Sequence, residues 1–317
     1  MSRSCWIITP GEAGFESQAR GLAEALDTVP VLKRVRVKRP WTWIPGSWWP
    51  APLSALAAGS DTLIAPWPDL IISCGRTAAP LAIAIKRASG GQTRVVHIQD
   101  PLMPLEAFDL VIAPRHDGVA GPNVVTTIGA IHGVTPGKLA AAAERWRDTF
   151  AGLPRPLLGA LIGGSNGRFT LDHAIMTSLA DGLATLARQH GAGLAVTPSR
   201  RTGAANEAVL RARLAGLPAF IWNGAGDNPY LGILALADML VVTEDSVSMT
   251  SEALATGKPV YVVRLRGHSR RQRRFHETLI AAGYTRPFDG ELARWSYAPP
   301  DDTSRAAAEC RRRFGWS

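Results

Sequence analysis

Residues 244–259 read EDSVSMTSEALATGKP, and the fold of the chain is clearest in this stretch. The polar triplet Glu244–Ser246 follows Met239–Val242, an apolar run with the length and composition of a buried strand. Serine and threonine, which are good N-cap residues, come next, and Gly257 with Pro259 marks the end of a helix. The stretch therefore predicts a strand, a polar turn and a helix in succession.

The same succession recurs in both halves of the chain. Apolar runs alternate with helical patterns up to a helix predicted at residues 136–150, and a Pro/Gly-rich break follows at residues 152–156. Leu157–Ile162 then restarts the alternation. Strands that alternate with helices favour a parallel sheet.

The length of 317 residues fits two domains of about 150 residues each. We predict an α/β chain with one Rossmann-like domain at residues 1–152 and a second at residues 157–317. A helical pattern at residues 303–314 is expected to return to the first domain.

The formal net charge is +9 and the pI is about 10.1, which favours anionic partners. No apolar run is long enough to span a bilayer, and the N-terminus reaches Gly11 too soon for a signal peptide. These observations predict a cytoplasmic protein.

Gly163 and Gly164 begin a second polar turn, which ends at Gly167 and lies between a predicted strand and a predicted helix. Glycines in this setting let backbone N–H groups approach a phosphate. Three further polar residues of this segment are candidates for the same site: Ser165, Asn166 and Arg168. A tight turn with a helix cap is the alternative interpretation.

Glu252 lies inside the predicted helix of the opening stretch, among small residues. A carboxylate there can accept hydrogen bonds from two hydroxyl groups, such as a ribose diol offers. A solvated helix glutamate is the alternative.

The serine-rich helix start with Glu252, Gly257 and Pro259 resembles the nucleotide-binding helix of GT-B glycosyltransferases, in particular that of the peptidoglycan GlcNAc-transferase family. That family also has a Gly-Gly-Ser turn, as at residues 163–165, and a strand ending in His-x-Gln, as at residues 97–99. The resemblance implies a GT-B fold with an interdomain cleft. It also implies that Glu252 holds the ribose and Ser165 approaches the diphosphate of a nucleotide-diphosphate sugar. We expect Asn166, Ser246 and Ser248 to bind the same donor.

A closer resemblance is to the bacterial relatives of the plant mitochondrial-fission proteins of the elongated-mitochondria type. The motifs that carry it are SCGR at residues 73–76, HIQDP at 97–101, PRHD at 114–117 and DSVSMTSEA at 245–253. The resemblance identifies a family rather than an activity, because the bacterial members divide no mitochondria.

The peptidoglycan enzyme family carries a histidine in its first Gly-rich turn, whereas residues 11–18 read GEAGFESQ here. A catalytic base would therefore come from Glu16, from Asp100 or from the pair His116 and Asp117, of which the last three follow predicted strand ends. Loop residues without a catalytic task are the alternative for this pair.

Four further residues are expected on the acceptor side of the first domain: Gly11, Gly14, Arg76 and Gln99. Arg76 could pair with a phosphate or with a local carboxylate. The histidines show no zinc-binding spacing and no GxGxxG opens either half. We therefore expect neither a metal nor a bound cofactor.

Lys33–Trp49 holds five basic residues followed by four tryptophans. Tryptophan favours the membrane interface and basic residues favour anionic headgroups, so an anionic membrane surface is a candidate partner, at the inner face of the membrane. Packing of an irregular loop is the alternative. No nucleic-acid partner is expected, because no known RNA- or DNA-binding module is present.

We therefore expect a glycosyltransferase that binds a nucleotide-diphosphate sugar and acts on an unknown acceptor. One alternative is a non-hydrolysing nucleotide-sugar epimerase, which shares the fold. The other is a non-catalytic GT-B-derived protein that works at a membrane or on a partner.

Overall fold

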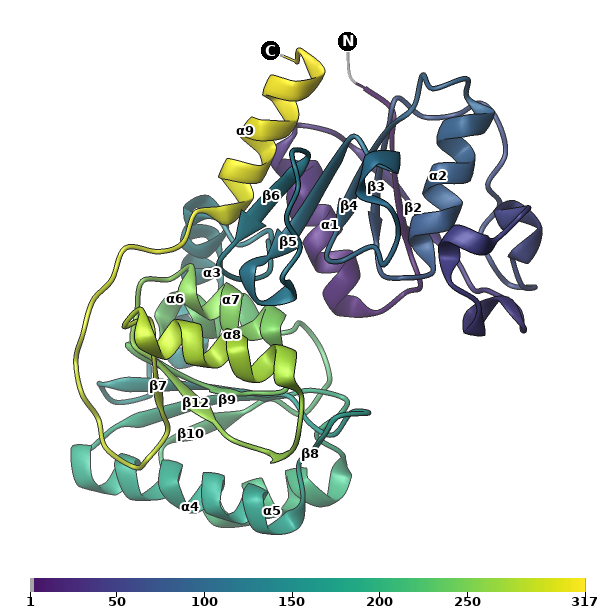
Figure 1. Cartoon of the computed structure of the whole chain (residues 1–317). Coiled ribbons are helices and arrows are strands. Elements are labelled where there is room, and N and C mark those ends of the chain that lie inside the picture. Colours follow the sequence, from purple (N-terminus) through teal and green to yellow (C-terminus); the bar gives the residue numbers. More distant parts are fainter. Residues whose placement is uncertain (1–2, 317) are drawn as a thin grey trace. The chain divides into compact units, whose positions relative to one another are not determined.

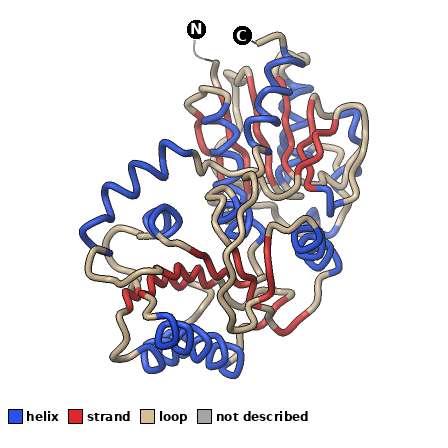
Figure 2. Tube along the Cα trace, turned by 90° about the vertical axis from the view of Figure 1, so that its left-hand side faces the viewer, coloured by secondary structure: helices blue, strands red, loops and turns tan. Residues whose placement is uncertain are grey.

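Two parallel six-stranded sheets organise the computed structural model, which describes residues 3–316. The chain divides into two units, which are described separately. Unit 1 comprises residues 3–133 and 301–316, and unit 2 comprises Val134–Pro300. In each unit, the strands form one layer with helices on either side (Figure 2).

The sheet of unit 1 consists entirely of parallel pairs. Its strands are, in spatial order, β2 (Pro30–Arg34), β1 (Cys5–Thr9), β3 (Leu70–Cys74), β4 (Arg94–Ile98), β5 (Leu110–Pro114) and β6 (Val124–Thr127). The order changes direction between β1 and β3, as in flavodoxin-like sheets.

Both faces of this sheet are covered, because successive strand residues point to opposite sides. Ile7 packs in one core with α1 (Ala13–Ala25) and α9 (Asp302–Phe314), while Ile8 packs in the other with α2 (Ala78–Ala88). Near-continuous apolar strands are the expected signature of such a doubly covered sheet.

The C-terminal helix α9 belongs to unit 1. The Asp302 carboxylate accepts hydrogen bonds from the backbone N–H groups of Ile128 (2.7 Å) and Gly129 (3.1 Å), and Ala306, Ala307 and Cys310 are buried in the core beside α1.

The sheet of unit 2 is also parallel throughout. Its strands are, in spatial order, β10 (Ala219–Ile221), β9 (Gly193–Pro198), β7 (Leu157–Ile162), β11 (Met239–Thr243), β12 (Val260–Val263) and β14 (Thr285–Pro287). This is the strand order of the dinucleotide-binding Rossmann fold. The prediction of two Rossmann-like α/β domains is confirmed.

Helices cover both faces of this second sheet as well (Figure 1). On one face lie α4 (His173–His190) and α5 (Ala204–Leu214). On the other lie α6 (Tyr230–Leu236), α7 (Val247–Leu254) and α8 (Arg270–Ala281). A two-residue antiparallel pair joins β8 (Phe169–Thr170) to β13 (Arg266–Gly267).

Helix α3 (Pro136–Phe150) packs with unit 2 rather than with unit 1. The Trp146 ring fills the space that a side chain at Gly232 of α6 would need. The rings of Phe150 and Phe220 pack edge to face, with 5.2 Å between their centres. The division between the units therefore falls after residue 133, earlier than the break that we predict at residues 152–156. Within residues 3–316, no helix combines the length and apolar character that crossing a membrane requires.

Candidate functional site

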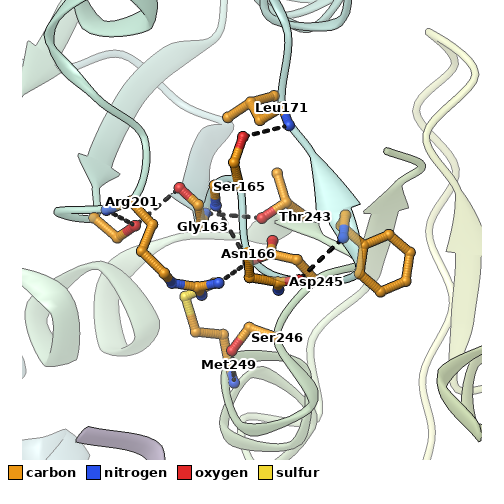
Figure 3. A network of polar contacts seen from close by, with 12 residues as sticks. Gly163, Ser165, Asn166, Leu171, Arg201, Thr243, Asp245, Ser246 and Met249 are labelled. Carbon is orange, nitrogen blue, oxygen red and sulfur yellow. Dashed lines mark hydrogen bonds and ion pairs between the residues drawn. The ribbon is translucent and has the colours of Figure 1, made fainter. Parts of the chain in front are cut away.

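The strand order of unit 2 changes direction between β7 and β11, and open α/β sheets bind ligands at the carboxyl edge beside such a point. Three loops gather there, each following one strand: Gly163–Gly167 after β7, Ser199–Thr202 after β9 and Glu244–Ser246 after β11. Figure 3 shows how their side chains converge.

Gly163 and Gly164 are glycines because two neighbours come too close for a side chain. A Cβ atom at Gly163 would overlap the Asp245 carboxylate, and one at Gly164 would overlap the backbone carbonyl of Arg201. The Gly163 N–H donates to Thr243 Oγ1 (2.8 Å), and the Gly164 N–H donates to Asp245 Oδ2 (3.2 Å). These two amides therefore hold the turn in place and are not free to bind a phosphate.

Ser165 and Asn166 have exposed side chains that also stabilise the turn. Ser165 Oγ accepts a hydrogen bond from the Leu171 N–H (3.0 Å), while Asn166 Oδ1 accepts from the N–H groups of Arg168 (2.8 Å) and Phe169 (3.0 Å). The Arg168 side chain is exposed. The hydroxyl proton of Ser165 is still available to a ligand.

Arg201 and Asp245 form an ion pair at the centre of the three loops, with Arg201 Nη1 at 2.7 Å from Asp245 Oδ2 (Figure 3). The Asp245 side chain is completely buried, whereas that of Arg201 is 42% exposed. The guanidinium therefore compensates a buried negative charge and still presents donors to solvent. Arg201 is not among the residues that the sequence predicts for the site, although an Arg-Arg pair one residue after a strand was the available signal.

Helix α7 begins at this edge of the sheet. Ser246 caps it, because its Oγ accepts a hydrogen bond from the Met249 N–H (3.2 Å). The first turn of a helix carries partial positive charge, which attracts anions. Ser248 lies in this turn and is half-buried.

Glu252 lies further along α7 and is buried. Its carboxylate accepts a hydrogen bond from the hydroxyl of Tyr230, the first residue of α6. Burial and the nearby Glu252 charge raise the pKa of Tyr230 well above its usual value. Glu252 therefore does accept a hydroxyl group, as we expect for a diol ligand, but here the hydroxyl belongs to the protein.

Unit 1 brings two of the expected acceptor-side residues together through Gln18. The Gln18 side chain donates to the Gly14 carbonyl (3.0 Å), and Gln99 Nε2 donates to Gln18 Oε1 (3.5 Å). Gln99 adopts a left-handed φ of +81°, a strained conformation that often marks functional loops. Gly11 and Arg76 are exposed at the ends of β1 and β3.

The candidate bases of unit 1 are all engaged. Glu16 forms a two-point ion pair with Arg34, at 2.7 and 3.0 Å. Asp100 Oδ1 accepts a hydrogen bond from the backbone two residues later, at 2.9 Å. His116 Nε2 lies 3.3 Å from Asp117 Oδ1, but the two side chains are only 2% and 1% exposed. The geometry of this pair suits a base with its orienting partner, while its burial keeps it from solvent.

His97, in the His-x-Gln sequence, is a core residue. It is fully buried on β4, its Nδ1 lies 2.8 Å from the Ser73 hydroxyl, and burial lowers its pKa to about 3. Within residues 3–316, no cluster of three or more His, Cys, Asp or Glu side chains is suited to hold a metal ion.

Comparison with known sequences matches residues 13–314 to the family described as "Mitochondrial fission ELM1". The chain is 37% identical over 282 residues to the mitochondrial fission protein ELM1 of Arabidopsis thaliana, covering 79% of this chain. It spans 65% of the length of that plant protein.

Comparison with solved structures finds UDP-sugar enzymes along nearly the whole chain. The UDP-GlcNAc 2-epimerase of Methanocaldococcus jannaschii matches with a TM-score of 0.58 at 11% identity, covering 98% of this chain and 99% of that one. A UDP-glucosyltransferase of Polygonum tinctorium matches with a TM-score of 0.57 at 12% identity, covering both chains completely. MurG of Acinetobacter baumannii matches with a TM-score of 0.51 at 13% identity, covering 98% and 91%. The fold is therefore of the GT-B type, as the sequence predicts.

Proposed function

The chain belongs to the mitochondrial fission ELM1 family, and from that premise we propose that it binds a nucleotide-diphosphate sugar and transfers the sugar to an acceptor. The observation that carries the proposal is the buried carboxylate of Glu252 on α7, at the carboxyl edge of a Rossmann sheet. The UDP-sugar enzymes that match this chain over its whole length support the same conclusion.

The donor would bind to unit 2 in two parts. Glu252 would accept the ribose hydroxyls in place of the Tyr230 hydroxyl, and Ser165 Oγ would donate to the diphosphate. The capped start of α7, with Ser246 and Ser248, would supply backbone N–H groups to the same diphosphate. Arg201 lies at this edge with part of its guanidinium exposed, so it would add a charge-assisted contact.

Transfer would break the bond between the anomeric carbon and the diphosphate oxygen, which leaves with the bonding electrons. A hydroxyl oxygen of the acceptor would form the new bond and lose its proton to a base. Helix N-termini and arginine side chains can stabilise the leaving diphosphate, so this chemistry requires no metal ion. For the acceptor side we propose Gln99, Asp100 and His116 of unit 1.

The engagement of the candidate bases favours a second possibility, in which the chain binds the nucleotide sugar without turning it over. Glu16 is neutralised by Arg34, and the pair His116 and Asp117 is enclosed. An epimerase is the other alternative, since an epimerase has the highest TM-score, 0.58, of the three enzymes compared by name.

Isothermal titration calorimetry with UDP-GlcNAc, UDP-glucose and UDP tests the donor site. Glu252→Ala should weaken binding by about 1–3 kcal/mol, because the ligand hydroxyls lose their charged acceptor. Glu277→Ala, which removes an exposed carboxylate of α8, is the matched control and should change nothing.

Each outcome separates the alternatives. Absence of binding by the parent protein, or equal affinity of Glu252→Ala and parent, contradicts the donor site. If UDP-GlcNAc binds, NMR of the bound sugar distinguishes interconversion of epimers from release of UDP on addition of acceptor. Binding without interconversion, and without release of UDP with any acceptor tested, favours the non-catalytic alternative.

A further inference from the structure

A loop at residues 37–56 leaves the sheet of unit 1 beyond β2 and returns to it. Its base is closed by the bridge between Val37 and Leu56 and by a hydrogen bond from the Lys38 N–H to the Ala55 carbonyl (3.0 Å). Three short 3-10 turns lie between these ends: Trp41–Trp43, Gly46–Trp48 and Pro52–Ala55. In Figure 1 the loop, in indigo, projects from unit 1 near α2.

The four tryptophans of this loop divide into two pairs. Trp49 is 6% exposed, its Nε1 donates to the Ile44 carbonyl (3.2 Å), and its ring lies 5.8 Å from that of Trp41. Trp43 and Trp48, by contrast, are 70% and 74% exposed. Packing of the loop therefore explains Trp41 and Trp49 but leaves two indoles in water without a structural reason.

The sequence around the exposed indoles contains basic residues but no acidic ones. No Asp or Glu occurs between Asp27 and Asp61. Arg36, Lys38 and Arg39 are exposed, and none of them forms an ion pair with any residue from 3 to 316. This stretch of the chain therefore presents positive and apolar side chains together.

The loop packs closely against α2 and the segment after β4, at the carboxyl edge of the sheet of unit 1. A Cβ atom at Gly46 would lie 3.1 Å from Pro80 of α2 and 3.3 Å from the Met103 sulfur, so the turn fits closely against both. Leu102, the neighbour of Met103 in sequence, is 59% exposed and has a left-handed φ of +52°. These contacts fix the position of the turn that carries the exposed Trp48 indole.

We propose that residues 36–49, named here the tryptophan loop, dock on an anionic lipid bilayer. The Trp43 and Trp48 indoles would enter the headgroup region, which is the environment that tryptophan prefers. Arg36, Lys38 and Arg39 would contact anionic headgroups. The Arg39 guanidinium already lies 5.3 Å from the centre of the Trp43 ring, so one cation and one indole are placed to enter the interface together. The inference does not depend on sugar transfer.

Flotation with lipid vesicles tests the proposal on the full chain. We expect the protein to float with vesicles of phosphatidylcholine containing about one-third phosphatidylglycerol, and to remain in the soluble fraction with phosphatidylcholine alone. Raising the salt should weaken the binding, because exposed charges are screened.

Two variants assign the binding to the tryptophan loop. The triple variant Arg36→Gln, Lys38→Gln, Arg39→Gln should lose roughly 100-fold in affinity, at about fivefold for each cation. The double variant Trp43→Ser, Trp48→Ser should bind more weakly at every salt concentration and keep the salt dependence. Both changes are confined to exposed side chains, so circular dichroism should show the parent fold.

The matched control is the triple variant Arg20→Gln, Arg87→Gln, Arg188→Gln, which removes the same charge from exposed sites elsewhere. It should retain almost all of the affinity. Loss of binding in the control equal to that in the loop variants would overturn the proposal, because general charge would then explain the affinity. Equal binding to both vesicle compositions would also overturn it. So would displacement from vesicles by a single-stranded oligonucleotide that binds more tightly, since nucleic acid uses the same mixture of aromatic and basic groups.

Discussion

Gly164 and Gly167 belong to the same turn but have different surroundings. A Cβ at Gly164 would overlap the Arg201 carbonyl, whereas one at Gly167 would meet nothing within 4 Å. Gly164→Ala should therefore destabilise the protein by about 1–3 kcal/mol, as overpacking does, and Gly167→Ala should be nearly neutral. Urea unfolding of both variants measures the difference. Equal stabilities would mean that the loops are not packed as closely as described.

Arg201 compensates a buried charge, so its removal should be costly. Arg201→Gln leaves the Asp245 carboxylate without its cation, and we expect a loss of about 1–3 kcal/mol in the free energy of unfolding. The neighbouring Arg200, also exposed, forms no ion pair within residues 3–316, and Arg200→Gln is the control. Thermal unfolding compares the two. If both variants match the parent protein, the ion pair contributes no stability.

The candidate site could be predicted from sequence only where its residues are local. Glu252 and the Gly163–Ser165 turn lie in short motifs that directly follow recognisable strands, so their setting could be read from the sequence. Tyr230 meets Glu252 from 22 positions away, on a different helix, and no pattern marks it. The ion pair of Arg201 with Asp245 depends likewise on the pairing of β9, β7 and β11.

At the scale of elements, the buried strands were the most predictable. Leu157–Ile162 coincides with β7, and Met239–Val242 covers all but the last residue of β11, because a strand covered on both faces is continuously apolar. Helix α8 is harder to recognise from sequence, since RRQRRFHETLIA carries its buried apolar positions Phe275 and Leu279 among many cations.

Asp302 determines how the last helix is attached. It is buried, burial raises its pKa, and its carboxylate accepts the N–H groups of Ile128 and Gly129. Asp302→Ala should leave these two donors unsatisfied and cost about 1–3 kcal/mol in the free energy of unfolding. Asp301→Ala alters the exposed neighbour, whose side chain makes no capping bond, and should cost little. Chemical denaturation of the pair checks the prediction, which an unaffected Asp302→Ala would contradict.

At the scale of the whole molecule, the boundary between the units was the least predictable feature. The segment at residues 152–156 has the composition of a linker, yet it lies within unit 2 because α3, which precedes it, packs on α6. The Pro/Gly composition of a segment indicates that its backbone is stiff. The boundary between two domains depends instead on which helix covers which sheet. The contact between Trp146 of α3 and Gly232 of α6 determines which unit α3 joins, and neither residue predicts this contact from the sequence.

Each unit also contains a buried histidine that resists protonation, and this links the stability of the whole molecule to pH. Burial lowers the pKa of His97 in unit 1 from 6.5 to about 3, and burial also lowers the pKa of His276 in unit 2. Below pH 6.5 the unfolded chain binds protons at these rings that the folded chain does not bind, so stability falls as the pH falls. His97 alone should contribute a slope of about 1.4 kcal/mol per pH unit, between pH 6.5 and about pH 3.

Urea unfolding at a series of pH values measures this slope. His97→Gln should lower stability at neutral pH, because the ring leaves a cavity, and should flatten the dependence on pH below 6.5. His173→Gln, at an exposed position in the first turn of α4, should keep the slope of the parent protein. If His97→Gln unfolds with the same dependence on pH as the parent protein, His97 takes up its proton equally in both states. Burial of His97 would then not cause the acid sensitivity, and His276→Gln, with the same control, would be expected to flatten the pH dependence instead.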